Sequence, residues 1–300
     1  MGSFECGLWA GSMKDLVRRL LLQVSPIALF KLQHYKLHKQ FGCYAYWPNL
    51  ASPRTFNEHV LRSKLDDSFH SIGKKVVDKF EAKKYVSDRV GQDKVIPTLG
   101  IFDDLESLMS SDFSESHVIK PTHLSGQVIF RSGGQKKLTS GEMAQISDWL
   151  RRNHYYSTGE PQYRDLKPRI IVEPFIGTDS EPPNDYKIFC WQGEPRLIQV
   201  DTSRFQCHRR NFFDLNWHPL DLQLRYPRTN ELIDKPARLA EMVEVAGRLA
   251  LDFRFVRVDL YAIAGKVMFG ELTFHPESGN APFGRLESDL ALGKYFGSVN

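Results

Sequence analysis

Two strand-like segments near the C-terminus constrain the fold more than any other part of the sequence. Residues 255–261 and 267–273 are rich in strand-forming residues, and a short turn separates them. Successive side chains of a strand point to opposite faces. In the first segment one face therefore carries Val256, Val258 and Leu260, and the other carries Arg257, Asp259 and Tyr261. We expect an antiparallel hairpin with one face in the core and one charged face.

A turn over residues 264–266 would place two carboxylates opposite each other, Asp259 on one strand and Glu271 on the other. The other pairs of this register are Ile263 with Val267, Tyr261 with Phe269, and Arg257 with Thr273. Like charges directly across a ladder destabilise it. A Mg²⁺ ion would remove that cost, because it prefers oxygen ligands from one or two carboxylates, substrate phosphates and water. A shifted register, or neutralisation by Arg257 alone, is the alternative.

Helices and strands are mixed along the rest of the chain. The predicted helices cover residues 13–42 with a break near Pro26, then 55–64, 74–90, 102–109, 143–153 and 236–251. The predicted strands cover residues 95–97, 118–120, 128–130, 169–172, 186–190 and 196–200. Thr55 and Glu58 form a capping box that begins the second helix. The mixture of helices with mostly antiparallel strands predicts the α+β class.

The composition argues against several classes of protein. With 300 residues, of which 41% are hydrophobic, the chain can form one large domain or two lobes. The four cysteines are scattered, which argues against a disulfide framework or a structural zinc site and favours a reducing cytoplasm. The net charge of +4 is concentrated between Met13 and Leu50, where six Lys and Arg accompany one acid. The near-neutral remainder argues against a nucleic-acid-binding protein.

The N-terminal segment, residues 13–42, is both basic and apolar. We expect its helices to pack on the rest of the protein; contact with an anionic membrane surface is the alternative. Its most apolar stretch, Leu20 to Phe30, is too short to cross a bilayer. Residues 1–12 end in Gly-Ser before Met13, and we interpret them as an expression scar.

Five further segments follow one another in the order found in ATP-grasp enzymes. They are Asp78-Lys79 with Lys84, Val118–Pro121, Ser125-Gly126, Ile171–Ile176 and Asp185–Gly193. Together with the hairpin, they resemble the ATP-grasp family over residues 52–292. Residues 55–58 and 185–193 are most similar to its TupA-like branch, which is associated with teichuronopeptide and other surface-polysaccharide clusters. Two departures are Thr273, where the family pattern has Asn, and the single glycine of residues 122–127.

The resemblance implies an ATP-grasp fold, in which two α+β lobes hold ATP between them and an N-terminal helical segment precedes them. It divides the chain into the N-terminal segment at residues 13–72, an N-lobe at 73–172 and a C-lobe at 173–300. ATP and Mg²⁺ are the implied cofactors.

The resemblance also implies roles for individual residues. The implied nucleotide-binding residues are Lys79, Lys120, Ser125, Gly126, Glu173, Phe175, Ile176, Asp185 and Lys187. The implied metal ligands are Asp259, Glu271 and Thr273. The implied catalytic residues are Arg257, Lys120 and Ser125. Backbone groups of Phe175 and Ile176 would read the base edge, and Arg257 would stabilise the transferring phosphoryl group. For Lys79, an exposed helical lysine is the alternative.

The predicted substrate site is the basic segment between Asp201 and Asp214. Its basic residues, which suit a carboxylate or phosphate of an acidic glycan, are Arg204, His208, Arg209 and Arg210. The first three are the predicted substrate residues. A solvated basic loop is the alternative.

The implied activity is that of an ADP-forming carboxylate–amine ligase. The expected partners are a uronic acid or other acidic glycan of a surface polysaccharide and an amino acid as the amine, with no nucleic acid. The expected location is the cytoplasm, with peripheral contact at the inner face of the membrane through residues 13–42. A glycan kinase on the same fold, or a non-catalytic nucleotide-binding or membrane-associated module, is the alternative.

Overall fold

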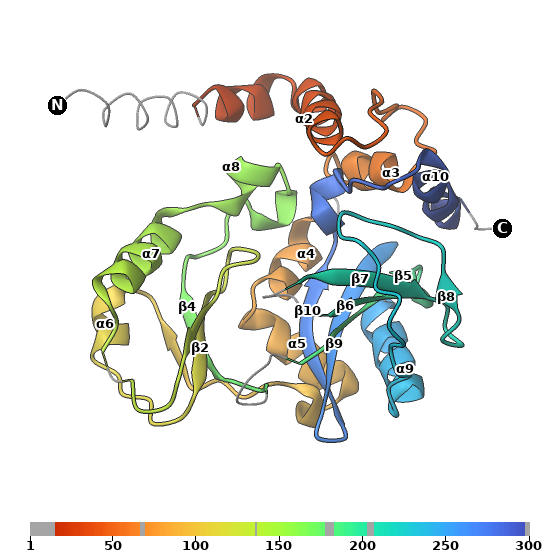
Figure 1. The fold of residues 1–300 in the computed structure, drawn as a ribbon. Helices are drawn as coiled ribbons and strands as arrows, with labels where there is room; N and C mark the ends of the chain where they lie inside the picture. The colour runs from red at the N-terminus through yellow and green to blue at the C-terminus, as the bar shows by residue number, and fades with distance from the viewer. Residues whose placement is uncertain (1–15, 67–69, 136, 178–182, 203–206, 298–300) are drawn as a thin grey trace. The chain divides into compact units, whose positions relative to one another are not determined.

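The computed structural model describes residues 16–66, 70–135, 137–177, 183–202 and 207–297. They form two compact units (Figure 1). Unit 1 contains the described residues of Met1–His70, Asn153–Asp165 and His275–Asn300. Unit 2 contains those of Ser71–Arg152 and Leu166–Phe274, and both β-sheets belong to it. The lobe boundaries predicted at residues 72 and 172 stay a prediction.

Unit 1 is helical. Its helices are residues 16–24, α2 (Pro26–Gln40), α3 (Phe56–Ser63), α8 (His154–Thr158), η3 (Pro161–Tyr163), η4 (Pro276–Gly279), α10 (Leu286–Gly293) and η5 (Lys294–Phe296). Pro26 accounts for the predicted break, because proline suits the first position of a helix and not its interior. The predicted capping box of α3 is confirmed: the Thr55 hydroxyl accepts from the Glu58 N–H at 3.1 Å, and the Glu58 carboxylate accepts from the Thr55 N–H at 3.0 Å.

The N-terminal helices contribute to the core of unit 1. Leu22, Leu29 and Phe30 are buried together with Leu50 and Leu61. This confirms the predicted packing of the helices. None of the helices in the described ranges is both long and apolar enough to span a lipid bilayer.

Unit 2 contains a four-stranded antiparallel sheet in the order β1-β4-β2-β3. Its strands are β1 (Gly100–Phe102), β2 (His117–Pro121), β3 (Ile129–Arg131) and β4 (Ile170–Pro174). One face, which includes Ile119, packs against α6 (Leu105–Met109) and α7 (Ser140–Arg151). Strand alternation places Lys120 and Glu173 on the other face.

The second sheet of unit 2 has six antiparallel strands in the order β10-β9-β5-β6-β7-β8. Its strands are β5 (Asp185–Trp191), β6 (Glu194–Thr202), β7 (Arg209–Phe213), β8 (Pro219–Leu220), β9 (Phe255–Ile263) and β10 (Lys266–Thr273). Helix α9 (Leu239–Ala250) covers one face with its buried side chains, among them Met242 and Leu249 (Figure 1). The opposite face carries the polar side chains of β5, β9 and β10.

The predicted continuous helix over residues 74–90 is wrong. The chain forms α4 (His70–Val77) and then, after a break, α5 (Glu81–Val90). Asp78 accounts for the break, because its buried carboxylate accepts a hydrogen bond from the Phe80 N–H at 2.9 Å. A side chain that bonds to the backbone two residues later competes with a continuous helix.

The predicted strand at residues 95–97 is also wrong. The short helix η2 (Gln92–Lys94) precedes these residues, and β1 begins only at Gly100. Pro97 has no N–H to donate to a ladder. The other predicted helices and strands are present in the described residues with small shifts at their ends, which confirms the α+β class.

Candidate active site on the two sheets of unit 2

Lys79 lies in the break between α4 and α5 and is half-buried. Its N–H donates to the Thr122 carbonyl at 3.1 Å, and its ammonium donates to the Leu124 carbonyl. Burial lowers the pKa of Lys79; the charge of Glu271 acts to raise it and that of Lys120 to lower it further. The ammonium therefore lies within electrostatic reach of the four-stranded sheet and of the β9–β10 hairpin.

Glu173 holds two lysines on the same face of the four-stranded sheet. Its Oε2 lies 2.8 Å from the Nζ of Lys120, and its Oε1 lies 2.5 Å from the Nζ of Lys83. Burial acts to raise the pKa of Glu173, but these two cations outweigh it and hold the pKa below its ordinary value. One buried carboxylate thus holds two ammonium groups side by side at the site.

Lys83 was not among the residues selected from the sequence. Lys84 was selected instead, but its side chain is 81% exposed and pairs with Asp88 on the surface of α5. The sequence holds no clear signal for Lys83 over Lys84, because Lys79 lies in the break before α5 and helical spacing from Lys79 does not apply.

The β9–β10 hairpin pairs Asp259 with Glu271, as the sequence predicts, but by a different route. The turn has two residues, Ala264 and Gly265, both with positive φ, instead of the predicted three. The predicted pairs Ile263 with Val267 and Tyr261 with Phe269 are therefore wrong. A register shift of one residue at Gly270 then compensates, so that Asp259 pairs with Glu271 and Arg257 with Thr273.

Arg257 ties these side chains together. Its Nε and Nη2 donate to the two oxygens of Asp259, each at 2.7 Å, and Nη2 also donates to the Thr273 hydroxyl at 3.0 Å. That hydroxyl donates to the Glu271 Oε1 at 3.1 Å. Burial opposes the charge of Arg257, yet Asp259 and Glu271 raise the pKa of its guanidinium above its ordinary value.

Lys187 extends the charged network to β5. Its ammonium donates to the Asp259 Oδ2 at 2.7 Å and to the Asp185 Oδ2 at 2.5 Å. Burial acts to raise the pKa of Asp259, but Arg257 and Lys187 together lower it. The structure thus brings together four of the predicted site residues, Arg257, Asp259, Asp185 and Lys187, in one buried network.

The polar face continues across β6 and β7 through Arg210, which belongs to the predicted basic segment, and through Gln199 and Asp201, which the sequence did not single out. Asp201 pairs with Asp185 across β5–β6 and with Arg210 across β6–β7. Arg210 donates to both oxygens of Asp201, at 2.7 and 3.1 Å, and Gln199 donates to the same carboxylate at 3.1 Å. The alternation of polar and apolar residues in β6 could have indicated this extension.

The β9–β10 hairpin carries oxygen donors of the kind that Mg²⁺ prefers. In the described part of the chain, no group of three or more His, Cys, Asp or Glu side chains converges on a point that could hold a metal ion. The hairpin provides two carboxylates and a hydroxyl. The Glu271 side chain is 37% exposed, whereas Asp259 is buried and its oxygens accept from Arg257 and Lys187. Mg²⁺ commonly takes one or two carboxylates and completes its shell with phosphate and water. Glu271 is the more accessible of the two carboxylates, and metal ligation by Asp259, Glu271 and Thr273 stays a prediction.

The predicted phosphate loop follows β2. Ser125 and Gly126 are exposed, Gly126 has a φ of +74°, and Leu124 beside them is buried. At the predicted base-binding hinge, the Phe175 N–H donates to the Ser116 carbonyl at 2.9 Å. The N–H that would read the base is therefore engaged within the sheet, and the roles of Phe175 and Ile176 stay predictions.

The predicted substrate residues do not form one group. Arg204 lies outside the described residues. The Nε2 of His208 lies 3.4 Å from the Asp201 Oδ1, on the polar face, and its ring stacks on Tyr226. Strand alternation places Arg209 on the face opposite Arg210.

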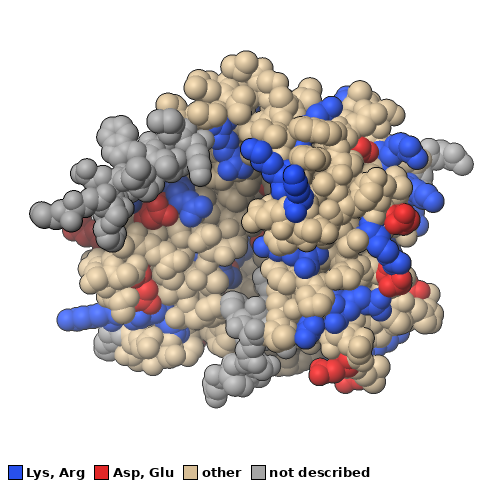
Figure 2. Space-filling view, turned by 45° about the horizontal axis from the view of Figure 1, so that its top comes forward, with Lys and Arg blue, Asp and Glu red and all other residues tan. Residues whose placement is uncertain are grey.

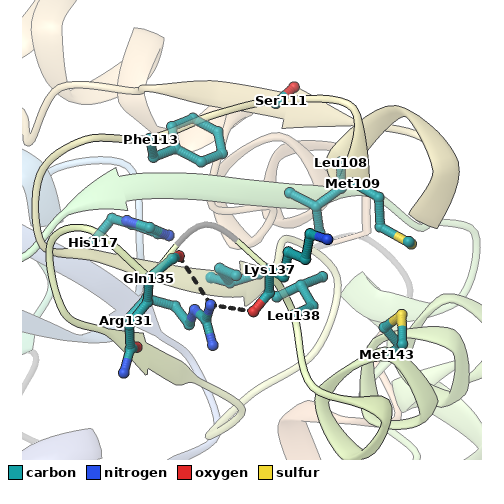
Figure 3. A pocket seen from close by; sticks show the side chains of 11 residues that line it. Leu108, Met109, Ser111, Phe113, His117, Arg131, Gln135, Lys137, Leu138 and Met143 are labelled. Atoms are coloured by element: carbon teal, nitrogen blue, oxygen red, sulfur yellow. Dashed lines mark hydrogen bonds between the residues drawn. The ribbon is translucent and has the colours of Figure 1, made fainter.

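A separate cavity of about 370 Å³ lies within unit 2, away from these charges (Figure 3). His117 and Ile119 line it, and strand alternation places them on the face of β2 opposite Lys120. Arg131 at its edge donates to the carbonyls of Gln135 and Lys137 and to Glu142. The cavity is therefore not part of the charged site.

A small antiparallel sheet with lysines beside a buried glutamate, and a larger sheet with a carboxylate hairpin, are the arrangement expected of the ATP-grasp class. Comparison with protein families agrees with this class: the family model described as TupA-like ATPgrasp matches residues 61–297. The chain therefore belongs to the TupA-like ATP-grasp family, which confirms the resemblance found in the sequence.

Solved structures give only a distant likeness. The ATP-grasp ligase PsnB with a minimal precursor is 13% identical, with a TM-score of 0.35, and the match covers 66% of this chain and 52% of that chain. For the D-alanine–D-alanine ligase of Bacillus anthracis the values are 17%, 0.36, 66% and 56%. For the same enzyme of Helicobacter pylori they are 15%, 0.41, 75% and 59%. The chain thus spans little more than half the length of these proteins. A search of curated proteins gives no match.

Proposed function

We propose that this chain is an ATP-dependent ligase that converts a carboxylate into an acyl phosphate and joins it to an amine. The observation that carries the proposal is the position of Lys79, whose charge interacts both with Lys120 and with Glu271. Phosphates bound beside Lys79 would therefore lie near a second lysine, Lys120, and near Glu271, the carboxylate that we propose as a metal ligand.

In this proposal Lys79 and Lys120 bind phosphate oxygens of ATP as point charges. Arg257 is held in a fixed orientation by its two bonds to Asp259, so that it can stabilise the charge that develops on the transferring phosphoryl group. Mg²⁺ held by Glu271 and Asp259 would neutralise phosphate charge. Ser125 and Gly126 would close over the phosphates through their loop.

The proposed reaction has two steps. An oxygen of the substrate carboxylate attacks the γ-phosphorus of ATP, the bond to the β-phosphate oxygen breaks, and ADP leaves. The amine nitrogen then attacks the acyl carbon, the carbon–oxygen bond to phosphate breaks, and inorganic phosphate leaves while the nitrogen gives up a proton. Charge accumulates on oxygen in both steps, which is why a fixed guanidinium and buried lysines suit this chemistry.

For the acid we propose a uronic acid or another acidic glycan of a surface polysaccharide, and for the amine an amino acid. Membership of the TupA-like family supports the glycan, and His208, which lies on the polar face, supports an acidic group. Asp201 orients His208 and Arg210 on the same polar face as the carboxylate hairpin. We further propose a cytoplasmic location, where ATP is supplied.

A hydroxylamine trap tests the proposal. The protein is incubated with ATP, Mg²⁺, hydroxylamine and a panel of uronic and amino acids, and the products are weighed by mass spectrometry. ADP together with a hydroxamate is the expected result, because hydroxylamine captures an acyl phosphate. ADP with a stable phosphorylated sugar and no hydroxamate would indicate a glycan kinase instead of a ligase. ATP binding without turnover on any acid would favour a non-catalytic nucleotide-binding module.

A further inference from the structure

The N-terminal helix exposes an apolar stripe. Four apolar side chains recur at helical spacing on residues 16–24: Leu16, Val17, Leu20 and Val24. Their exposed fractions range from 49% for Val17 to 81% for Val24. The same helix also buries Leu22 in the core of unit 1. A surface helix normally turns polar side chains to water, so an outward apolar stripe indicates a binding surface.

Exposed aromatic residues also follow α2 in the chain. Trp47 is 57% exposed and stacks on Tyr35 with ring centroids 5.0 Å apart, and Tyr44 is 56% exposed. Trp and Tyr gather where proteins meet the headgroup region of a bilayer, because one end of each ring is apolar and the other is polar.

The charge of this region is of one sign. Residues 16–47 contain five Lys and Arg and no Asp or Glu. Lys36 and Lys39 are exposed on α2, and Lys31 is half-buried there. Figure 2, in which α2 is turned toward the viewer, shows basic side chains scattered among uncharged ones. Such a surface is complementary to an anionic partner.

We propose that residues 16–47 dock on an anionic lipid bilayer, with the apolar stripe in the headgroup region and the lysines beside lipid phosphates. The described part of the first helix, residues 16–24, is about 14 Å long and can lie in the interface. No helix in the described ranges is long and apolar enough to cross a hydrocarbon core of about 30 Å. A second copy of the chain suits the surface less well, because two acid-free basic segments would be brought together. This docking is independent of the ligase chemistry.

Sedimentation with lipid vesicles tests the proposal. The full chain is mixed with vesicles of phosphatidylcholine alone or with one third phosphatidylglycerol, and the bound fraction is measured at low and high salt. We expect binding to the anionic vesicles that weakens with salt. The double variant Leu20→Gln, Val24→Gln should bind roughly tenfold more weakly, because two apolar side chains no longer enter the bilayer.

The matched control is Leu232→Gln, an apolar residue of unit 2 that is 91% exposed and lies outside the stripe. This variant should bind like wild type, and all variants should keep the wild-type melting temperature because the replaced side chains are exposed. Equal binding to both kinds of vesicle, or wild-type binding by the double variant, would overturn the proposal. If vesicles do not bind and light scattering shows a dimer that the double variant loses, the surface belongs to a second copy instead.

Discussion

Asp259 lies directly opposite Glu271 across the β9–β10 hairpin, because Gly270 shifts the register of β10 by one residue. Two facing carboxylates would repel each other, and the structure compensates them unequally. Arg257 and Lys187 donate to the buried Asp259 at 2.7 Å, whereas Glu271 lies 3.5 Å from the Arg257 guanidinium and remains partly exposed. The first prediction follows from this accessible, more weakly paired carboxylate.

Glu271→Ala should abolish turnover and leave the fold intact. The side chain is 37% exposed and is not part of the core, so the free energy of unfolding should change by less than about 1 kcal/mol. ADP release and urea denaturation measure the two effects. Glu194→Ala is the control, because this exposed glutamate lies in the turn region of the β5–β6 hairpin of the same sheet. Full activity in the Glu271 variant would show that Glu271 is not a required metal ligand.

Gly270→Ala should weaken both the fold and the activity. A Cβ at this position would lie 3.0 Å from the Asp259 carbonyl and 3.0 Å from the Tyr261 ring. We expect a cost of about 1–3 kcal/mol in urea denaturation, together with slower turnover as Glu271 moves relative to Asp259. Gly141→Ala in α7 is the control, since its Cβ would meet nothing closer than 4.0 Å. Equal stability of the two variants would show that the hairpin tolerates the added carbon.

Lys83→Gln and Lys84→Gln should differ sharply although the residues are neighbours. Lys83 reaches the buried Glu173, and its loss should cost about 1–3 kcal/mol of stability and weaken ATP binding. Lys84 forms an exposed pair with Asp88, and its loss should cost less than about 0.5 kcal/mol. Urea denaturation and calorimetric titration with ATP compare the two. Indistinguishable variants would place Lys83 outside the site.

Glu173→Gln should make stability less sensitive to acid. Burial acts to raise the pKa of Glu173, but Lys120 and Lys83 hold it below its ordinary value of 4.5. The stabilisation is therefore fully present above pH 4.5 and is lost as the pH falls through the lower pKa of the folded state. The variant should lose about 2–4 kcal/mol at neutral pH.

The free energy of unfolding, measured in urea over a series of pH values, provides the test for Glu173. Wild type should lose stability more steeply than the variant below pH 4.5. Parallel curves would mean that Lys120 and Lys83 do not lower the pKa of Glu173 in the folded state. Glu194→Gln, which changes an exposed glutamate, should follow the wild-type curve.

Sequence patterns were sufficient where the physical cause is local. The capping box of Thr55 and Glu58 depends on residues three apart, and the facing of Asp259 and Glu271 follows from strand alternation around one turn. Even for this hairpin, the predicted turn is one residue too long, and the shift of register at Gly270 offsets that error. A shift of register within a strand has no strong signal in the local sequence beyond a glycine.

Patterns failed where residues distant in the chain decide the outcome. The break at Asp78 is stabilised by the Arg169 guanidinium, which lies 3.2 Å from its carboxylate although it is far away in sequence. The choice of Lys83 over Lys84 depends on the position of Glu173, and the inclusion of Asp201 and Arg210 depends on the order of strands in the sheet.

The sequence by itself determined the α+β class, the family, the charged hairpin and the residue types of the site. Strand alternation and helix capping depend on residues close together in the chain, and the order of the motifs can be read along it. The tertiary structure decided which cations meet which carboxylates and how much of each side chain water can reach. These depend on which strands lie side by side and on the burial that results, and burial is a property of the packed chain and not of any one segment.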